Sequence, residues 1–237
     1  MPLNLEKIDA LILCGGFGIR LKAVIGDKPK CMAEFNGKPF LDILCRNLER
    51  FGIKRIILCV GYKAKVIKKY YKNKTGIIFS QEKSPLGTGG AIKRAQRLIR
   101  SNPFLVLNGD SFCNVNLSDF LKFHINRKAR ATICLAKLNQ DKNSKDFGAV
   151  ILDGQKRILG FCEKKKNKAG LINAGIYLFD KKMLSLIPRD QIYSLELDLF
   201  PKTQKRFFGF STNQPFIDIG TPGRFRKAKK VFTLWKL

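Results

Sequence analysis

Short apolar runs alternate with segments of helical periodicity through the first half of the chain. The apolar runs predict buried strands, namely Ile8–Leu13, Arg55–Val60, Ile77–Phe79 and Phe104–Leu107. The segments between and after them predict helices at about 40–51, 64–71, 87–100 and 117–126. In the helix over 64–71 we expect the pairs Val66-Ile67 and Tyr70-Tyr71 to face inward. This alternation predicts a doubly wound α/β fold with a parallel sheet.

The pattern changes after Arg130 and becomes rich in strands. We expect strands at Thr132–Ala136, Gly148–Leu152, Ile158–Cys162, Ile172–Phe179 and Phe207–Phe210, a short helix at Ser194–Phe200 and a last helix that ends near Trp235. Asp153-Gly154 predicts a hairpin turn. Because no linker or repeat interrupts the pattern, we predict one domain over residues 1–237, with halves of about 1–130 and 131–237.

A glycine-rich turn follows the first predicted strand. Gly15, Gly16 and Gly18 leave backbone N–H groups free to face an anion, and Arg20 and Lys30 follow within a short distance. Leu21 stands where a dinucleotide fingerprint needs its third glycine, and the G-K-[ST] of a Walker A loop is absent. Taken alone, the turn fits an ordinary strand-to-loop connection as well as it fits a phosphate site.

A second glycine-rich segment and one aspartate also follow predicted strands. Gly87-Thr88-Gly89-Gly90 opens a helix after the third strand, and Asp110 follows the fourth. Because open α/β sheets bind ligands at the carboxyl ends of their strands, we expect these groups at one edge of the sheet. Read alone, the glycine segment is a normal helix start and Asp110 a turn or cap residue.

At this point the chain resembles the sugar-1-phosphate nucleotidyltransferases, whose signature is close to L-A-G-G-x-G-T-R-L with a later K-P. The resemblance is nearest to the D-glycero-α-D-manno-heptose-1-phosphate guanylyltransferases and covers nearly the whole chain. It implies a Rossmann-like nucleotidyltransferase fold with a mixed, mostly parallel sheet flanked by helices. Two residues depart from the signature: Cys14 replaces alanine and Ile19 replaces threonine. They leave open a non-catalytic member of the family.

The resemblance also implies a reaction, in which a nucleoside triphosphate and a sugar 1-phosphate give a nucleotide sugar and pyrophosphate with the cofactor Mg²⁺. The implied catalytic residues are Arg20, Lys30, Asp110 and Asp218, and the two aspartates are the implied metal ligands. The implied nucleotide contacts are Leu13, Gly15, Gly16, Gly18, Glu82, Gly87 and Thr88. The implied sugar-phosphate contacts are Gly148, Glu163, Lys164 and Asn173.

The identity of the base depends on Glu82. A carboxylate can accept from both N1–H and N2–H₂ of guanine, which favours GTP and, from the resemblance, transfer of GMP to a heptose 1-phosphate. Neighbouring Gln81 keeps UTP or dTTP open, because an amide matches the edge of uracil or thymine. A mannose-1-phosphate guanylyltransferase and the uridylyl-, thymidylyl- and cytidylyltransferases therefore remain alternatives.

The charge and the cysteine content limit which other classes of protein fit this sequence. The net charge of +28, from 46 Lys and Arg against 18 Asp and Glu, suits a polyanion, so a basic nucleic-acid-binding protein is the alternative of another class. The basic residues are spread through the chain without a nucleic-acid-binding motif, and we favour a lysine-rich solvated surface. Seven scattered cysteines and one histidine argue against a disulfide framework and a zinc site.

The sequence gives only indirect information on location and assembly. No apolar run is long enough to span a membrane, and the N-terminal residues lack the apolar region of a signal peptide. We therefore expect a cytoplasmic protein. A homodimer is left open.

Overall fold

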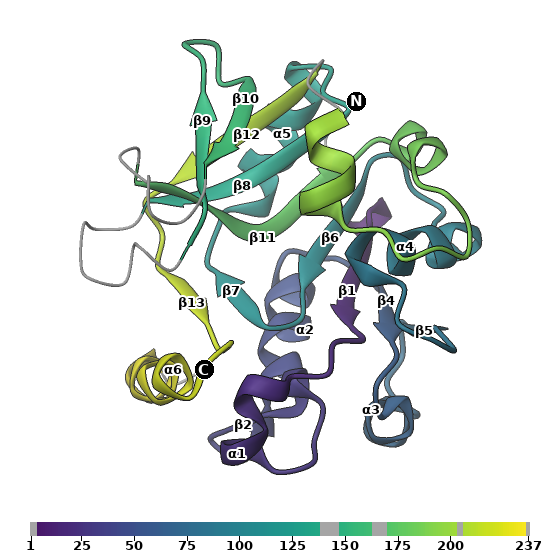
Figure 1. Ribbon diagram of the computed structural model, residues 1–237, viewed down its shortest axis with the longest axis vertical. Coiled ribbons are helices and arrows are strands. Elements are labelled where there is room, and N and C mark those ends of the chain that lie inside the picture. The colour runs from purple at the N-terminus through teal and green to yellow at the C-terminus, as the bar shows by residue number, and fades with distance from the viewer. Residues whose placement is uncertain (1–3, 138–146, 163–169, 203–205, 236–237) are drawn as a thin grey trace.

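Strand β1 (Asp9–Cys14) lies at the centre of the parallel part of the sheet. The computed structural model describes residues 4–137, 147–162, 170–202 and 206–235. On one side of β1 lie β4 (Arg55–Val60) and then β5 (Ile77–Gln81), and on the other lies β6 (Phe104–Asn108), all parallel (Figure 1). The chain thus reverses its winding direction between β1 and β6, which is where open α/β sheets bind ligands.

The second half of the chain extends this sheet. Its central strand is β11 (Leu171–Phe179), which pairs antiparallel with β6. The other strands of the extension are β8 (Ala131–Lys137), β9 (Ala149–Leu152), β10 (Ile158–Cys162) and β12 (Phe207–Thr212). Strands β8 and β9 pair with β11, and β10 and β12 continue outward from them. The expected α/β fold with a mixed sheet is confirmed.

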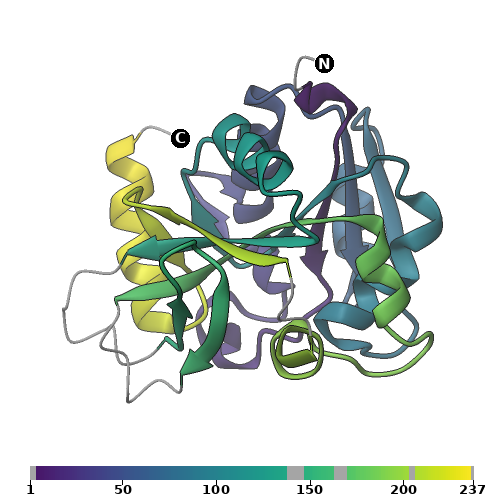
Figure 2. The same cartoon turned by 90° about the horizontal axis from the view of Figure 1, so that it is seen from above.

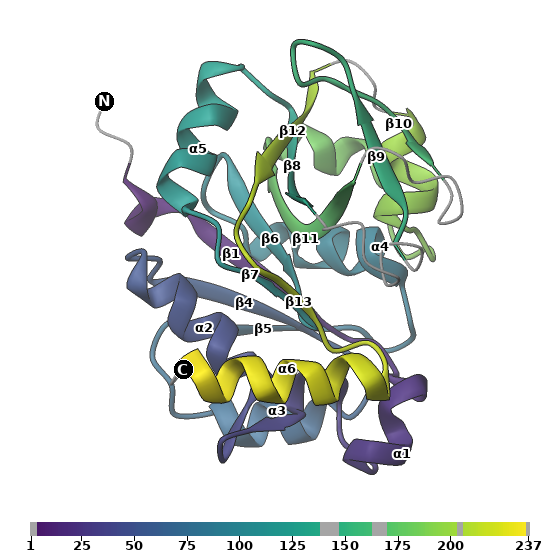
Figure 3. The same ribbon diagram turned by 90° about the vertical axis from the view of Figure 1, so that its left-hand side faces the viewer.

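The remaining regular elements are short strands and the covering helices. The short strands are β2 (Glu34–Phe35), β3 (Lys38–Pro39), β7 (Ser111–Cys113) and β13 (Phe216–Asp218). The α-helices are α1 (Lys22–Ile25), α2 (Phe40–Arg50), α3 (Ala64–Tyr71), α4 (Gly87–Arg94), α5 (Leu117–Asn126) and α6 (Pro222–Trp235). Helices α4 and α6 lie on opposite sides of the molecule (Figures 2 and 3).

Two apolar clusters cover the two faces of the sheet. Helices α2, α3, α5 and α6 contribute to one cluster, and α4 contributes to the other. Strand β1 supplies both, since Ala10 and Ile12 belong to the first cluster and Leu11 to the second. This alternation is what a strand buried on both faces requires, because successive side chains point to opposite sides.

Several expectations for individual elements were wrong. The helix expected to reach about residue 100 ends at Arg94, and a 3₁₀ helix over Ala95–Leu98 follows it. In α3, Ile67 and Tyr71 are buried but Val66 and Tyr70 are exposed. The buried residues of α3 are Ala64, Ile67 and Tyr71, which lie three and four positions apart on one narrow face, and Val66 and Tyr70 point about 100° away from their buried neighbours.

The histidine and the cysteines whose side chains the structure describes belong to the interior. Six cysteines of the described residues are free and buried. His124 is buried on α5, with Nδ1 2.8 Å from the Thr132 hydroxyl, and burial lowers its pKa to about 4. Within the described parts of the chain, no helix is both long and apolar enough to cross a membrane.

Candidate active site

The glycine turn follows β1 and is tied to the end of β6. Gly18 adopts a left-handed φ of +61°, and a side chain there would press against Lys30. Leu13 accepts a hydrogen bond through its carbonyl from the Gly109 N–H, at 3.0 Å. Arg20 is exposed on a 3₁₀ helix over Ile19–Leu21, directly after the turn. The backbone therefore positions the turn beside the residue that precedes Asp110.

Asp110 and Asp218 come together although they are far apart in the sequence. Asp110 lies between β6 and β7, and Asp218 is the last residue of β13. Strands β7 and β13 pair antiparallel with Asp218 opposite Ser111, and the Ile219 N–H donates to the Asp110 carbonyl at 3.0 Å. The pairing of these two short strands thus brings both aspartates to one place.

Each of the two aspartates has a cationic partner. The ammonium of Lys30 lies 2.6 Å from Asp110 Oδ2. Arg224, in the first turn of α6, donates from Nη1 to Asp218 Oδ1 at 2.9 Å and stacks over the Phe147 ring at 4.2 Å. Arg224 was not among the predicted site residues, and the only signal for it in the sequence is its place shortly after Asp218. The two ion pairs supply positive charge beside both carboxylates.

Glu82 lies directly against the glycine turn. A Cβ atom on Gly15 would lie only 2.4 Å from Glu82 Oε1, and one on Gly61 only 2.3 Å. The Leu86 N–H donates to Glu82 Oε2 at 3.2 Å. Burial raises the pKa of Glu82, while the Leu86 N–H and the charge of Arg94 oppose this effect. Glycine at 15 and 61 therefore leaves the space that the carboxylate occupies.

The second glycine-rich loop is held by the segment after residue 192. Gly87 has a left-handed φ of +72°, and a Cβ atom there would lie 2.7 Å from the Tyr193 carbonyl. The Thr88 hydroxyl accepts from the Leu195 N–H at 2.8 Å and donates to Glu196 Oε2 at 3.1 Å. Neither Tyr193 nor Glu196 was among the predicted site residues. These contacts hold Gly87 and Thr88 by groups that lie more than 100 residues away in the chain.

The four residues predicted to contact the sugar phosphate are placed unequally. Asn173 lies on β11, where its amide group donates to the Tyr177 hydroxyl at 2.9 Å and accepts from the Gly175 N–H at 2.9 Å. Gly148 is exposed just before β9. Glu163 and Lys164 lie outside the described residues. The structure therefore brings Asn173 into a polar network and gives no geometry for the Glu-Lys pair.

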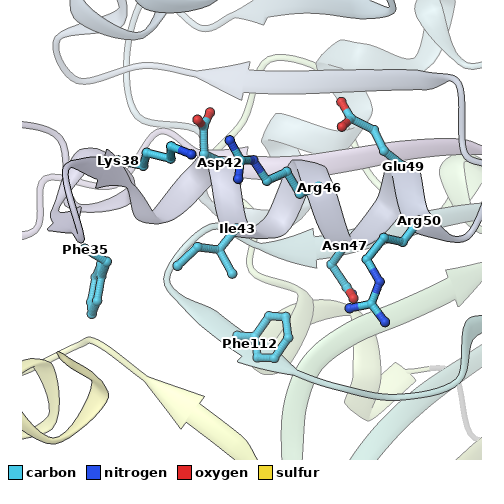
Figure 4. Close-up of a pocket in the computed structure, with 9 residues that line it drawn as sticks. All are labelled: Phe35, Lys38, Asp42, Ile43, Arg46, Asn47, Glu49, Arg50 and Phe112. Atoms are coloured by element: carbon cyan, nitrogen blue, oxygen red, sulfur yellow. The ribbon is translucent and has the colours of Figure 1, made fainter. Parts of the chain in front are cut away.

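A separate cavity of about 370 Å³ runs along α2 (Figure 4). Phe35, Ile43 and Phe112 form part of its wall. Asn47 also lines it and has a buried Oδ1 without a hydrogen-bond partner among the residues that the structure describes. None of the predicted site residues lines this cavity. The candidate active site lies instead at the carboxyl ends of β1, β5 and β6, where open α/β sheets form their ligand crevice.

Comparison with known proteins identifies the class. The nucleotidyl transferase family model matches residues 9–232, and the chain belongs to this family. Among curated relatives are two proteins named D-glycero-α-D-manno-heptose 1-phosphate guanylyltransferase. The one from Aneurinibacillus thermoaerophilus is 38% identical, covering 94% of this chain and 97% of the relative. The one from Campylobacter jejuni is 42% identical, covering 91% and 96%. The family resemblance is thereby confirmed.

A solved structure agrees with this assignment. HddC from Yersinia pseudotuberculosis, complexed with GMP-PN, superposes with a TM-score of 0.84 at 38% identity, covering 95% of this chain and 99% of that one. A solved protein from Bacillus anthracis, at 18% identity and a TM-score of 0.80, shares the fold. The Rossmann-like nucleotidyltransferase fold and the expectation of a nucleotidyl-transferring enzyme are confirmed.

Proposed function

We propose that this enzyme transfers GMP from GTP to D-glycero-α-D-manno-heptose 1-phosphate, giving GDP-heptose and pyrophosphate. The observation that carries the proposal is the meeting of three groups in one crevice. These groups are the glycine turn, the Asp110–Asp218 pair and the Glu82 carboxylate. The two heptose-phosphate guanylyltransferases, similar over nearly their whole length, support the choice of base and sugar.

In this proposal the glycine turn binds the triphosphate. The N–H groups of Gly15, Gly16 and Gly18 bind phosphate oxygens, and the backbone of Leu13 fixes the start of the turn. Arg20 is exposed and forms no ion pair within the part of the chain that the structure describes, so its guanidinium is free to take two phosphate oxygens. Lys30 adds positive charge where the α-phosphate meets its acceptor.

The acceptor supplies its own nucleophile. The second pKa of a phosphate monoester is about 6, so the sugar phosphate is largely a dianion at neutral pH and needs no general base. The enzyme must instead align two anions that repel one another and stabilise the charge that develops at the α-phosphate. The cations Lys30 and Lys164 are proposed to offset this repulsion, and Asn173, Gly148 and Glu163 to hold the sugar.

Asp110 and Asp218 are proposed to hold Mg²⁺. The fit is supported by their chemistry: the paired strands bring two aspartates to one place, and magnesium favours one or two carboxylates together with substrate phosphates. Each carboxylate is already paired with a cationic group, Asp110 with Lys30 and Asp218 with Arg224. When bound, the metal would neutralise charge on the reacting phosphates.

Glu82 is proposed to read the base. Its Oε1 lies over Gly15 at the nucleotide end of the crevice, and it is partly shielded from water. A carboxylate there accepts from both N–H groups of guanine, whereas a uracil would set an acceptor against it. The loop at Gly87 and Thr88 would cover the other side of the base.

A pyrophosphate-release assay tests the proposal. Purified protein is given GTP, UTP, dTTP or CTP with D-glycero-α-D-manno-heptose 1-phosphate, mannose 1-phosphate or glucose 1-phosphate, with Mg²⁺ present. We expect the highest kcat/KM for GTP with the heptose 1-phosphate. A higher value for mannose 1-phosphate would reassign the sugar, and release with no pair would identify a non-catalytic family member.

A further inference from the structure

Glu196 joins two parts of the crevice that contact different substrates in the proposed function. It lies in a π-helical turn, Leu195–Leu199. One carboxylate oxygen, Oε2, accepts from the Thr88 hydroxyl at 3.1 Å, and the other, Oε1, accepts from the Tyr177 hydroxyl at 3.2 Å. Thr88 belongs to the loop proposed to cover the base, and Tyr177 lies on β11. A single carboxylate therefore bridges the two halves of the chain.

Tyr177 extends this bridge to the sugar side. Its hydroxyl donates to Glu196 and accepts at 2.9 Å from the amide of Asn173. The ring is fully buried, and burial together with the negative charge of Glu196 raises the pKa of Tyr177 well above its ordinary value. The hydroxyl consequently stays protonated, and the order of donors runs from Asn173 to Tyr177 to Glu196.

The turn itself is held mainly by Ser194 and Asp198, although the Ser194 hydroxyl also donates to Glu196 Oε2 at 3.0 Å. The Ser194 hydroxyl accepts from the N–H groups of Glu196 and Leu197, so Ser194 caps the turn. Asp198 Oδ2 accepts from the Ser194 N–H at 2.7 Å and closes the turn from its other end. Asp198 thus offers a matched control, a carboxylate in the same turn that reaches neither Thr88 nor Tyr177 among its hydrogen bonds in the described structure.

We propose that Glu196 is a positioning residue that couples nucleotide binding to sugar-phosphate binding through Thr88, Tyr177 and Asn173. The inference rests on the proposed function, because that function assigns Thr88 to one substrate and Asn173 to the other. A nucleotide that fixes Thr88 also fixes Glu196 and Tyr177, and so orients the Asn173 amide before the second substrate arrives. Coupling of this kind is reciprocal, since each ligand must tighten the other by the same factor.

Calorimetry measures this coupling without turnover. The ligands are a GTP analogue with a methylene bridge between the α and β phosphorus atoms, which blocks the reaction, and D-glycero-α-D-manno-heptose 1-phosphate. The affinity for the analogue is measured with and without saturating sugar phosphate, all with Mg²⁺. In the wild type we expect the sugar phosphate to tighten analogue binding at least about fivefold, the lower end of typical coupling.

The variants decide whether Glu196 carries the coupling. We expect Glu196→Gln and Tyr177→Phe to reduce the factor to less than about twofold, and Asp198→Asn to keep the wild-type factor. Thermal unfolding of each variant separates loss of coupling from loss of structure. A wild type without coupling, or a folded Glu196→Gln variant that keeps it, would overturn the inference. If turnover identifies another nucleotide or sugar, the proposed function is wrong, and the same calorimetry is run with the unreactive analogue of that nucleotide and with that sugar phosphate. Failure of the proposed function and failure of the coupling are therefore distinguishable.

Discussion

The ammonium group of Lys30 lies 2.6 Å from a carboxylate oxygen of Asp110. The same lysine packs beside Gly220, where a Cβ atom would lie 3.2 Å from its Nζ and 2.9 Å from Asp218 Oδ1. Lys30 therefore pairs with one proposed metal ligand and approaches the other across Gly220. Its positive charge offsets part of the negative charge of the two aspartates.

The first prediction concerns the two aspartates. Asp110→Asn or Asp218→Asn should each cost about 3–4 kcal/mol of transition-state stabilisation, the worth of a strong preorganised electrostatic contact. The measurement is kcat/KM at saturating Mg²⁺, and chelation with EDTA should abolish wild-type turnover. Near-normal turnover in either variant would remove that residue from the metal site.

The second prediction concerns Arg20. Arg20→Lys keeps the charge but loses the planar fork. The transition-state stabilisation calculated from kcat/KM should therefore fall by about 1.5 kcal/mol or more, the net worth of one hydrogen bond to a charged group. Because Arg20 is exposed, the thermal stability of the Arg20→Lys variant should stay close to that of the wild type. If this variant and Lys30→Ala both turned over normally, the glycine turn would have only a structural role.

The third prediction uses Gly61, which contacts Glu82 and is not itself a proposed ligand. Gly61→Ala places a methyl group where Glu82 Oε1 now lies, at 2.3 Å, so the carboxylate must move. We expect the free-energy preference for GTP over UTP, calculated from the ratio of the two kcat/KM values, to fall by about 1.5 kcal/mol or more. Gly154→Ala is the control, because a Cβ atom there meets nothing within 4 Å. Equal nucleotide preferences in the two variants would show that base selection does not depend on the position of Glu82.

The fourth prediction concerns pH. Burial raises the pKa of Glu82 in the folded state above its ordinary value, so its charged form destabilises the fold. This cost is absent below the unfolded-state pKa and is fully present above the raised folded-state pKa. Glu82→Gln should therefore increase the free energy of unfolding at pH 7, and the gain should shrink as the pH falls from the raised folded-state pKa toward the unfolded-state pKa. Denaturant unfolding of both proteins from pH 7 to 3.5 measures this difference, and a gain independent of pH would show that Glu82 carries no such cost.

Much of the crevice could be predicted because its parts follow strongly apolar strands. The glycine turn, Glu82 and Asp110 each come at or near the end of such a strand, and parallel strands bring their carboxyl ends to one edge. The family resemblance supplied Asp218, whose meeting with Asp110 depends on the short β7–β13 pairing that periodicity did not indicate.

Residues whose roles depend on distant partners could not be found in this way. Glu196 lies in the segment Ser194–Phe200, for which the sequence predicts a short helix, and its bonds to Thr88 and Tyr177 arise only from the folded arrangement. Arg224 likewise reads as one basic residue among many in a chain with 46 lysines and arginines. Local sequence patterns indicate burial and turns, whereas these contacts depend on how distant elements pack together in the fold.

The central claim, guanylyl transfer to a heptose 1-phosphate, is tested most directly by competition. The enzyme receives equal concentrations of GTP, UTP, dTTP and CTP with D-glycero-α-D-manno-heptose 1-phosphate, and mass spectrometry quantifies each nucleotide sugar formed. GDP-heptose should dominate for the wild type, and Glu82→Gln should shift the product ratio toward UDP- or dTDP-heptose. A wild-type product mixture dominated by any other nucleotide, or an unchanged ratio in Glu82→Gln, would contradict the account.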